Sequence, residues 1–409
     1  MKLIQFSILN NPCNRYIALW CVYLLQGTLY AEGTLVSQSI LLVILLVSLF
    51  HVLNILREKK PPQIFKFLLV LIALYTIHGF FLLLKGGATN GTPNRTIAIN
   101  FLQSFYISIL PIFSFYFYAR KGYLSVETIR PWVIVFVPIA IALFYKMQKE
   151  AMEQAIGTTI YVDDVTNNAG YIIVALIPCA FVFKKQWIQY VLLVFCIVFT
   201  IFSMKRGAIL TSGVAILLYI HMRIRQARFS TKFGLLAVTV VIGVLVFHFL
   251  QETIFQNSYF QYRLQTTTEG FSSGRDELLS NCLHYYFNNE NIIQQVFGLG
   301  ANGTLSIVGN GAHNDWVELL VNQGLIGFVI FLLFWLSFYK TSRDRSLCQL
   351  SREALTLVFT ICFLRSFYSQ SINDISIFLS SIMGLAMCDG FRGMIVESSF
   401  RRSRHVMSA

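Results

Sequence analysis

This chain has 409 residues, of which 56% are hydrophobic and only 12% are charged, and its mean hydropathy is +0.63. Soluble globular domains carry about twice that share of charged residues, so an ordinary soluble fold is excluded. The formal net charge of +13 would suggest a nucleic-acid partner in a soluble protein. Here the charges lie between long apolar runs, which indicates a membrane protein instead.

Apolar runs long enough to cross a bilayer recur along the whole sequence. No cleavage site follows the first of them, so we expect that run to double as the targeting signal. The sequence predicts an all-α integral membrane protein of about twelve transmembrane helices, in a single polytopic domain over residues 1–409. The predicted spans are 16–30, 37–56, 65–84, 97–118, 131–146, 169–183, 187–203, 207–222, 233–250, 314–339, 354–372 and 375–391.

The Lys and Arg residues between these spans follow the positive-inside pattern. With the N-terminus in the cytoplasm, basic connections such as Arg57-Glu58-Lys59-Lys60 and Arg223-Ile224-Arg225 face the cytoplasm, and most acidic residues face outward. Both termini are then cytoplasmic. Because the outer segments are net acidic, arginines that face outward run against the local trend.

The eight cysteines do not suggest a disulfide framework or a zinc site. Most of them fall inside predicted spans, and Cys282 alone is clearly in an outer segment. No close Cys-x-x-Cys or Cys/His grouping occurs, so we interpret the cysteines as small apolar packing residues.

One connection, residues 251–313, is much longer than the others, and long loops usually carry function. We expect it to lie on the periplasmic side. Within it, Ser272-Ser273-Gly274-Arg275-Asp276-Glu277 is typical of a helix start. The glycine-rich stretch 298–311 then leads to His313, and it is not a P-loop because no Gly-Lys-Ser/Thr follows.

A second outer loop, residues 147–168, contains the adjacent acids Asp163 and Asp164. Carboxylates of this kind can bind a divalent ion. Two neighbouring acids in a polar loop are more typical of a solvated pair. The sequence therefore predicts no metal site and no cofactor.

Two cations, Lys205 and Arg206, occupy the very short outer turn between predicted spans 187–203 and 207–222. One explanation is that they extend toward lipid headgroups, as basic side chains at membrane interfaces do. The other is an anionic ligand, because a guanidinium binds diphosphate oxygens through two parallel hydrogen bonds. The local pattern favours the two explanations about equally.

Arg275 is a weak signal by itself, because an arginine in a loop is usually solvated. The position of Arg275 in the first turn of a predicted helix strengthens the signal for an anion-binding residue. The amide groups of a helix N-terminus and an arginine side chain can together hold a phosphate group. The neighbouring acids Asp276 and Glu277 fit an ordinary helix start equally well.

His313 stands where the long outer loop meets the predicted span 314–339. Asn314 and Asp315 can cap that helix, and Asp315 or Glu318 can orient or charge the imidazole. An unperturbed histidine titrates at about pH 6.5, so it can accept a proton at neutral pH. The alternative is a polar residue at a membrane interface without a chemical role.

Two further ionisable residues stand near the outer ends of the last spans. Asp374 lies in the tight turn before span 375–391, where it can cap the helix or pair with an arginine. Arg365 falls inside span 354–372. A charged residue within a membrane span is unfavourable and is a functional candidate by default.

The order of these residues resembles the O-antigen ligase and O-antigen polymerase superfamily. The resemblance is best over residues 168–330. It rests on Asn167-Asn168-Ala169-Gly170-Tyr171, on Lys205-Arg206-Gly207, on Ser273-Gly274-Arg275, and on His313-Asn314 followed by Gly324 and Gly327. The His-Asn start and the Gly-x-x-Gly end are its most specific part, and Asp374 falls where family ligases tend to carry an acid.

This resemblance implies a GT-C-like fold and a donor in which undecaprenyl diphosphate carries a glycan. Arg206, Arg275 and Lys205 would hold the diphosphate, and His313 would accept the proton of the attacking sugar hydroxyl. Asp374, Asn314, Asp315, Glu318 and Asn168 would support them. The acceptor would be lipid A–core or a growing glycan, at the periplasmic face of the bacterial inner membrane, and the reaction would invert the anomeric configuration without a metal.

Ligation onto lipid A–core and polymerisation of repeat units share this chemistry, and the sequence does not separate them. A polysaccharide flippase or other transporter is the alternative from a different class. A transporter predicts ionisable residues at mid-span and two pseudo-symmetric halves with paired broken helices. A peptidoglycan-type polymerase is a third possibility, which the His-Asn and Gly-x-x-Gly stretch disfavours.

Overall fold

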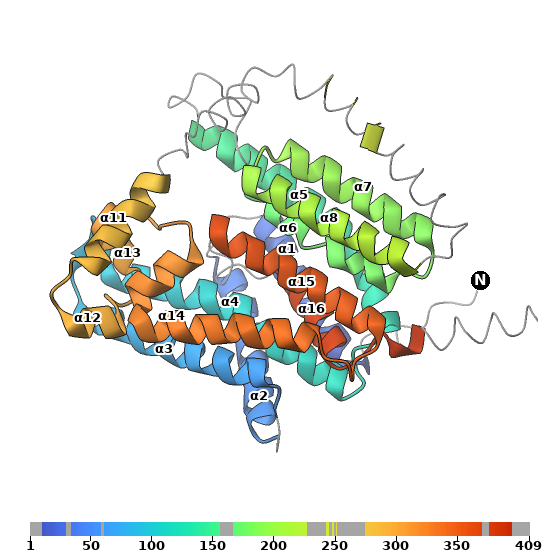
Figure 1. Cartoon of the computed structure of the whole chain (residues 1–409), viewed down its shortest axis with the longest axis horizontal. Coiled ribbons are helices and arrows are strands. Elements are labelled where there is room, and N and C mark those ends of the chain that lie inside the picture. Colours follow the sequence, from blue (N-terminus) through green and yellow to red (C-terminus); the bar gives the residue numbers. More distant parts are fainter. Residues whose placement is uncertain are drawn as a thin grey trace, which may run out of the picture. The chain divides into compact units, whose positions relative to one another are not determined.

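The computed structural model of the chain describes residues 10–29, 34–58, 61–155, 167–226, 243–244, 248, 251, 275–369 and 376–394. These residues form two compact units (Figure 1). Unit 1 comprises Met1–Tyr23, Ala31–Ile129 and Gly274–Ala409, and unit 2 comprises Leu24–Tyr30 and Arg130–Ser273.

Unit 1 is built around a long central helix, α4. That helix packs against α2, α3 and α16, while α14 packs against α3 and α15. The contact between α16 and α4 is close, because a Cβ atom placed on Gly384 would lie 2.6 Å from the carbonyl carbon of Phe115. The elements are α1 (Pro12–Leu29, with its last residues in unit 2), α2 (Leu35–Leu56), α3 (Gln63–Lys85), β1 (Ala88–Thr89), β2 (Thr92–Pro93), α4 (Asn94–Arg120), α11 (Arg275–Phe287), α12 (Ile292–Phe297), α13 (Gly303–Val308), α14 (Asp315–Ser342), α15 (Gln349–Tyr368) and α16 (Ile377–Met387).

A tight hairpin joins α3 to α4. Strands β1 and β2 pair antiparallel around Asn90 and Gly91, which have φ angles of 48° and 77°. Positive φ at both central residues is the geometry of the turn that suits a two-residue hairpin, and it explains the Asn-Gly sequence. The Asn90 amide donates to the carbonyl of Leu305 at 2.8 Å and so ties this hairpin to α13.

Unit 2 contains most of α5 (Val126–Ala155), then α6 (Gly170–Val174), a 3-10 helix η2 (Ile177–Val182), α7 (Gln186–Phe202) and α8 (Arg206–Gln226). The predicted span 169–183 is therefore not one regular helix. Pro178 lacks an amide hydrogen and cannot continue an α-helical ladder, which explains the change to a 3-10 turn. Nearly all side chains from Ala169 to Phe183 are buried. Irregular backbone at membrane depth is tolerated where it is buried inside the protein in this way.

Among the described residues, six helices are long and apolar enough to cross a membrane: α2, α3, α4, α5, α8 and α14. Helices α7 and α16 and the segment 170–182 are apolar but shorter. The chain is thus a multi-pass, mainly helical membrane protein, as predicted. The span expected at 233–250 lies largely outside the described residues, so the total of twelve stays a prediction.

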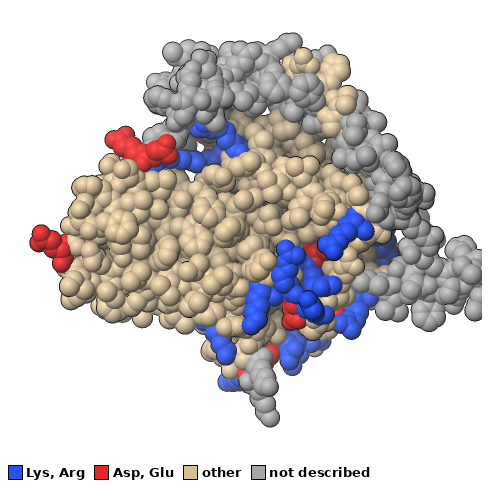
Figure 2. All heavy atoms as spheres, viewed as in Figure 1, with Lys and Arg blue, Asp and Glu red and all other residues tan. Residues whose placement is uncertain are grey.

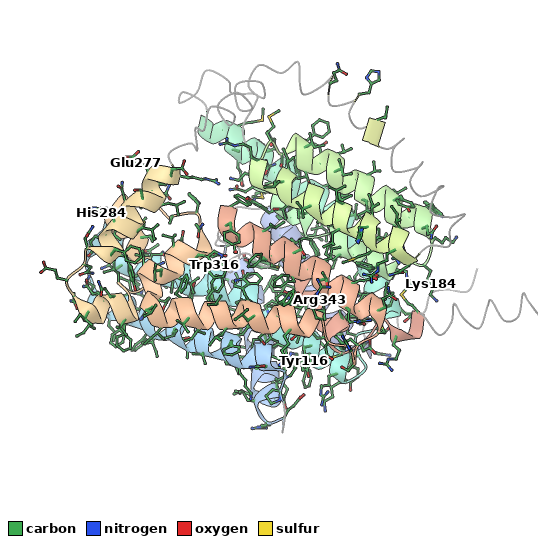
Figure 3. All side chains as sticks on the ribbon, viewed as in Figure 1. Tyr116, Lys184, Glu277, His284, Trp316 and Arg343 are labelled. Carbon is green, nitrogen blue, oxygen red and sulfur yellow. The ribbon has the colours of Figure 1, made fainter. Side chains whose placement is uncertain are left out.

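Basic residues gather at one end of unit 1, which we call the basic end (Figure 2). Arg120 pairs with Glu58 at 3.2 Å, and Arg392 donates to the carbonyl of Ser346 at 3.0 Å, so the ends of α2, α4, α14 and α16 meet there. We call the opposite end, formed by α11, α12 and α13, the loop end (Figure 1). Figure 3 labels Trp316, which is the second residue of α14, and Arg343, which follows its last residue.

Candidate active site

The N-terminus of α14 presents His313 from a defined backbone position. His313 has a φ of 53°, in the left-handed region that only a few non-glycine residues adopt. Its amide donates to Oε1 of Glu318 at 3.1 Å. Asn314 caps the helix, because its Oδ1 accepts from the amides of Trp316 at 3.0 Å and Val317 at 3.2 Å. A cap and a buried carboxylate together therefore fix the residue from which the imidazole projects.

The last turn of α15 collects contacts from two of the predicted site segments. Arg275 donates from Nη1 to the carbonyl of Tyr368 at 3.1 Å, and Asn314 donates from Nδ2 to the carbonyl of Phe367 at 3.3 Å. The final carbonyls of a helix lack partners within it, and they carry the negative end of its dipole. These carbonyls suit a guanidinium, and they bring Arg275 and the His313–Asn314 segment to the same turn.

Trp316 reinforces this junction between α14 and α15. Its Nε1 donates to Oγ of Ser366 at 2.9 Å, and its ring stacks on Phe367 with centroids 5.7 Å apart. The ring also makes an edge contact with Phe331, further along α14, at 4.8 Å. Trp316 could not be singled out from the sequence, because its partners on α15 lie about fifty residues away in the chain and only the fold reveals them.

Charged side chains are buried behind His313. Asp315 is 1% exposed and Glu318 is 6% exposed, while Arg365 on α15 is 3% exposed. Asp315 and Arg365 both lie within electrostatic range of the thiol of Cys362, so opposite charges share this interior. Buried charges are tolerated when a charge of the other sign is close by. Arg365 therefore lies in the same buried region as Asp315.

A small apolar core holds α11 to the first part of α14. Cys282 of α11 is buried against Ala312, Val317 and Val321. Burial raises the pKa of the Cys282 thiol to about 11, and the charge of Glu318 contributes to the same shift. Because α11 begins at Arg275 and packs on this core through Leu279, Cys282 and Leu283, the core also helps to fix Arg275 relative to His313.

Helix α14 is interrupted at Gly324, where φ is 67° and ψ is −167°. The continuous helix predicted over 314–339 is therefore wrong at this point. The carbonyls of Val321 and Asn322 accept from the amides of Leu299 and Gly300, each at 2.9 Å. The glycine-rich loop thus replaces the helical hydrogen bonds that the break removes, and it clamps the His313-bearing half of α14.

Three glycines at this clamp admit no side chain. A Cβ atom on Gly298 would lie 2.3 Å from the carbonyl oxygen of Asn322, and one on Gly324 would lie 2.4 Å from that of Val296. A Cβ atom on Gly327 would lie 2.1 Å from the Cβ of Gln323. The two glycines of the Gly-x-x-Gly stretch therefore each allow a close contact. Gly324 lies against the backbone of Val296, and Gly327 lies against the side chain of Gln323.

In unit 2, the turn that carries Lys205 and Arg206 is held by Asn167. The Asn167 amide donates to the carbonyl of Ser203 at 2.8 Å, and its side chain donates to the carbonyl of Phe144 at 2.9 Å. Arg206 then begins α8. The supporting residue predicted from the sequence is Asn168, but the structure gives these bonds to the neighbouring Asn167, and Asn168 is exposed.

The predicted site residues thus divide between the two units. Arg275, His313, Asn314, Asp315 and Glu318 lie in unit 1, whereas Lys205, Arg206 and Asn168 lie in unit 2. Asp374 lies outside the described residues, as do Asp163 and Asp164. Within the described part of the chain, no group of three or more His, Cys, Asp or Glu side chains is arranged to hold a metal ion.

Comparison with known families gives a match to part of the chain. Residues 191–332 match the family model described as O-antigen ligase, a segment that contains Arg206, Arg275, His313 and the glycine pair of α14. No curated protein matches the chain. The resemblance to the O-antigen ligase and polymerase superfamily, predicted from the motifs, is therefore confirmed over residues 191–332.

Proposed function

We propose that this protein is a membrane glycosyltransferase that moves a glycan from undecaprenyl diphosphate to a sugar hydroxyl. The observation that carries the proposal is the meeting of Arg275 and the His313–Asn314 segment at the last turn of α15. A cation for an anionic leaving group and a group that accepts a proton are then neighbours. The O-antigen ligase match over residues 191–332 agrees with this chemistry.

The reaction needs little more than positioning and charge. The acceptor oxygen forms a bond to the anomeric carbon as the bond from that carbon to the diphosphate oxygen breaks. The electron pair leaves with the lipid diphosphate, and the hydroxyl proton passes to His313. Diphosphate is already a good leaving group, so cations that stabilise its growing charge are the main requirement. Direct displacement inverts the anomeric configuration, and this scheme requires neither a nucleotide nor a metal.

Arg275 is suited to the diphosphate. It begins α11, so its guanidinium and the first amides of that helix both favour an anion. One Nη1 contact goes to Tyr368, and a guanidinium has five N–H donors, which leaves capacity for a ligand. Lys205 and Arg206 at the start of α8 would supply further positive charge, and Asn168 and Asp374 would support the site.

The charge distribution of unit 1 supports a periplasmic site. Positively charged connections stay in the cytoplasm, so the basic end of unit 1 would face inward and the loop end outward. Both termini would then be cytoplasmic, in the bacterial inner membrane. Lipid-linked glycans for surface polysaccharide are used at the outer face of that membrane, and lipid A–core or a growing glycan would be the acceptor.

A polysaccharide flippase is the second candidate, and two observations favour it. Interrupted helices such as α14 and buried charges such as Arg365 are features of membrane transporters. In this chain, however, the carbonyls of Val321 and Asn322 at the interruption accept from the amides of Leu299 and Gly300, so neither is open to an ion or a substrate. We therefore rank transfer above transport.

The two functions separate in a deletion strain that carries wild type or His313→Ala at matched expression. Electrophoresis of surface and lipid-linked glycans gives the result. Loss of glycan from lipid A–core with long chains still on the carrier indicates a ligase, and single repeat units in place of a ladder indicate a polymerase. A His313→Ala strain identical to wild type removes His313 from the chemistry and favours transport.

A further inference from the structure

Helix α12 shows an inverted distribution of polar and apolar side chains. Ile292 is 71% exposed and Ile293 is 70% exposed. The glutamines are half-buried and bond to the preceding loop instead: Gln294 Oε1 accepts from the Asn289 side-chain amide at 2.7 Å, and Gln295 Nε2 donates to the Asn289 carbonyl at 2.8 Å. A helix at a water-exposed surface normally has the opposite arrangement.

The outward side chains form one apolar patch at the loop end of unit 1. Phe287, at the end of α11, is 69% exposed, and Phe297, at the end of α12, is 51% exposed. Helix α12 itself contains no charged residue. Large exposed apolar side chains that gather at one end of a protein mark an interaction surface. We call Phe287, Ile292, Ile293 and Phe297 the α12 patch.

The depth of the α12 patch follows from the break in α14. Helix α12 packs against α14, and Gly324 comes closest to the backbone of Val296 in α12. Beyond Gly324, the helix from Leu325 to Ser342 is roughly 27 Å long at ~1.5 Å per residue, which nearly equals the ~30 Å hydrocarbon core of a bilayer. The break and α12 therefore lie where α14 enters the membrane.

The surface next to the break is also apolar. Leu325 and Val329, at the start of the membrane-crossing part of α14, are exposed in the protein, as expected of side chains that face lipid. The α12 patch adjoins this surface, because α12 packs on α14 at the break. The same hydrocarbon that covers α14 can cover the patch.

We propose that the α12 patch inserts into the acyl chains of the leaflet at the loop end, so that α12 is an interfacial anchor and not part of a free outer loop. Short helices with apolar side chains on one face lie in bilayer interfaces in this way. The segment 275–297 is then held at two points, by lipid at α12 and by the carbonyl of Tyr368 at Arg275. The anchor itself does not depend on the proposed glycan transfer. Only its suggested use, which is to hold Arg275 at the level of the lipid phosphates, rests on that proposed function.

The test is a depth measurement on the full-length protein in nanodiscs. Ile293→Cys and Phe287→Cys are each labelled with an environment-sensitive fluorophore, and His284→Cys, at an exposed position on α11 (Figure 3), is the matched control. Unsubstituted protein treated in the same way gives the background from native cysteines. Quenching is measured with lipids spin-labelled high in the acyl chain and with aqueous iodide.

The anchor predicts that labels at positions 287 and 293 are quenched by the spin-labelled lipid and protected from iodide, and that the label at 284 behaves in the opposite way. Strong iodide quenching at both test positions, equal to that at 284, would overturn the proposal. Protection from both quenchers would also overturn it, because another protein surface would then cover the patch. None of these results depends on whether the protein transfers glycan.

Discussion

Substitution of Gly324 by alanine tests whether the break in α14 is required by the fold. Gly324 has a φ of 67° and a ψ of −167°, a region that is nearly exclusive to glycine. Holding another residue there costs about 1–3 kcal/mol. The new Cβ atom would also lie 2.4 Å from the carbonyl oxygen of Val296, and overpacking of this kind costs about 1–3 kcal/mol.

The sum is a destabilisation of roughly 2–6 kcal/mol. If unit 1 unfolds in one transition, the melting temperature in detergent should fall by roughly 5–20 °C. Gly213→Ala is the matched control, because Gly213 lies inside α8 and a Cβ atom placed on it would meet no atom within 4 Å. That change should be neutral or slightly stabilising, since alanine favours a helix over glycine by ~1 kcal/mol.

A Gly324→Ala protein as stable as the Gly213→Ala protein would show that the fold does not require the break. Helix α14 could then become continuous without the clamp from residues 298–300. If stability falls but the remaining folded protein works normally, the clamp is structural and does not position His313.

Three further predictions concern the site. Arg275→Lys keeps the charge but loses the planar fork, so we expect glycan transfer to slow roughly tenfold to a hundredfold, measured as initial rate at equal protein level; an unchanged rate would exclude the diphosphate role. Glu318→Leu removes the acceptor of the His313 amide, so we expect the stability to fall by about 1–3 kcal/mol and glycan transfer to slow. Glu318→Gln keeps an acceptor and should recover much of both properties. Equal damage from the two variants would show that the charge of Glu318 matters and not its hydrogen bond. The pKa of the Cys282 thiol is raised to about 11, and the thiolate is the form that reacts with maleimide. Cys282 should therefore not be labelled at pH 7 in the native protein, but it should be labelled after denaturation. Rapid labelling of Cys282 in the native protein would contradict the burial of this residue against α14.

Much of the helical layout could be predicted from the sequence. Predicted spans 37–56, 65–84 and 187–203 correspond to helices Leu35–Leu56, Gln63–Lys85 and Gln186–Phe202. Long apolar runs that end at charged or turn residues define membrane helices with little help from tertiary structure. The cap at Asn314 is likewise predictable from an Asx residue placed before an apolar run.

The interruption of α14 could not be predicted in the same way. The triplet Asn322-Gln323-Gly324 is a short polar break in the apolar pattern, but the donors that replace the helical bonds come from Leu299 and Gly300, in a different segment. Pro178 is a local signal for the irregular segment 170–182, but the apolar run around it outweighs that signal. In both places the apolar residues on either side favour one continuous span and outweigh a short local signal.

The arrangement of the candidate site depends on tertiary contacts. Arg275 and His313 can be recognised individually from their positions in the sequence. Their common anchoring point, the carbonyls of Phe367 and Tyr368, lies in a helix that the motifs do not include. The sequence also does not show which of Asn167 and Asn168 faces the interior, because adjacent identical residues give no local clue.

The most direct test of the proposed function is transfer by the purified protein in liposomes. The donor is undecaprenyl diphosphate that carries a defined glycan, the acceptors are lipid A–core and the glycan-loaded carrier itself, and a chelator is present without any nucleotide. We predict glycan on one acceptor together with an equal amount of released undecaprenyl diphosphate, and loss of both products with His313→Ala. Wild-type protein that is folded and correctly inserted, but releases no undecaprenyl diphosphate with either acceptor, would contradict the proposed function.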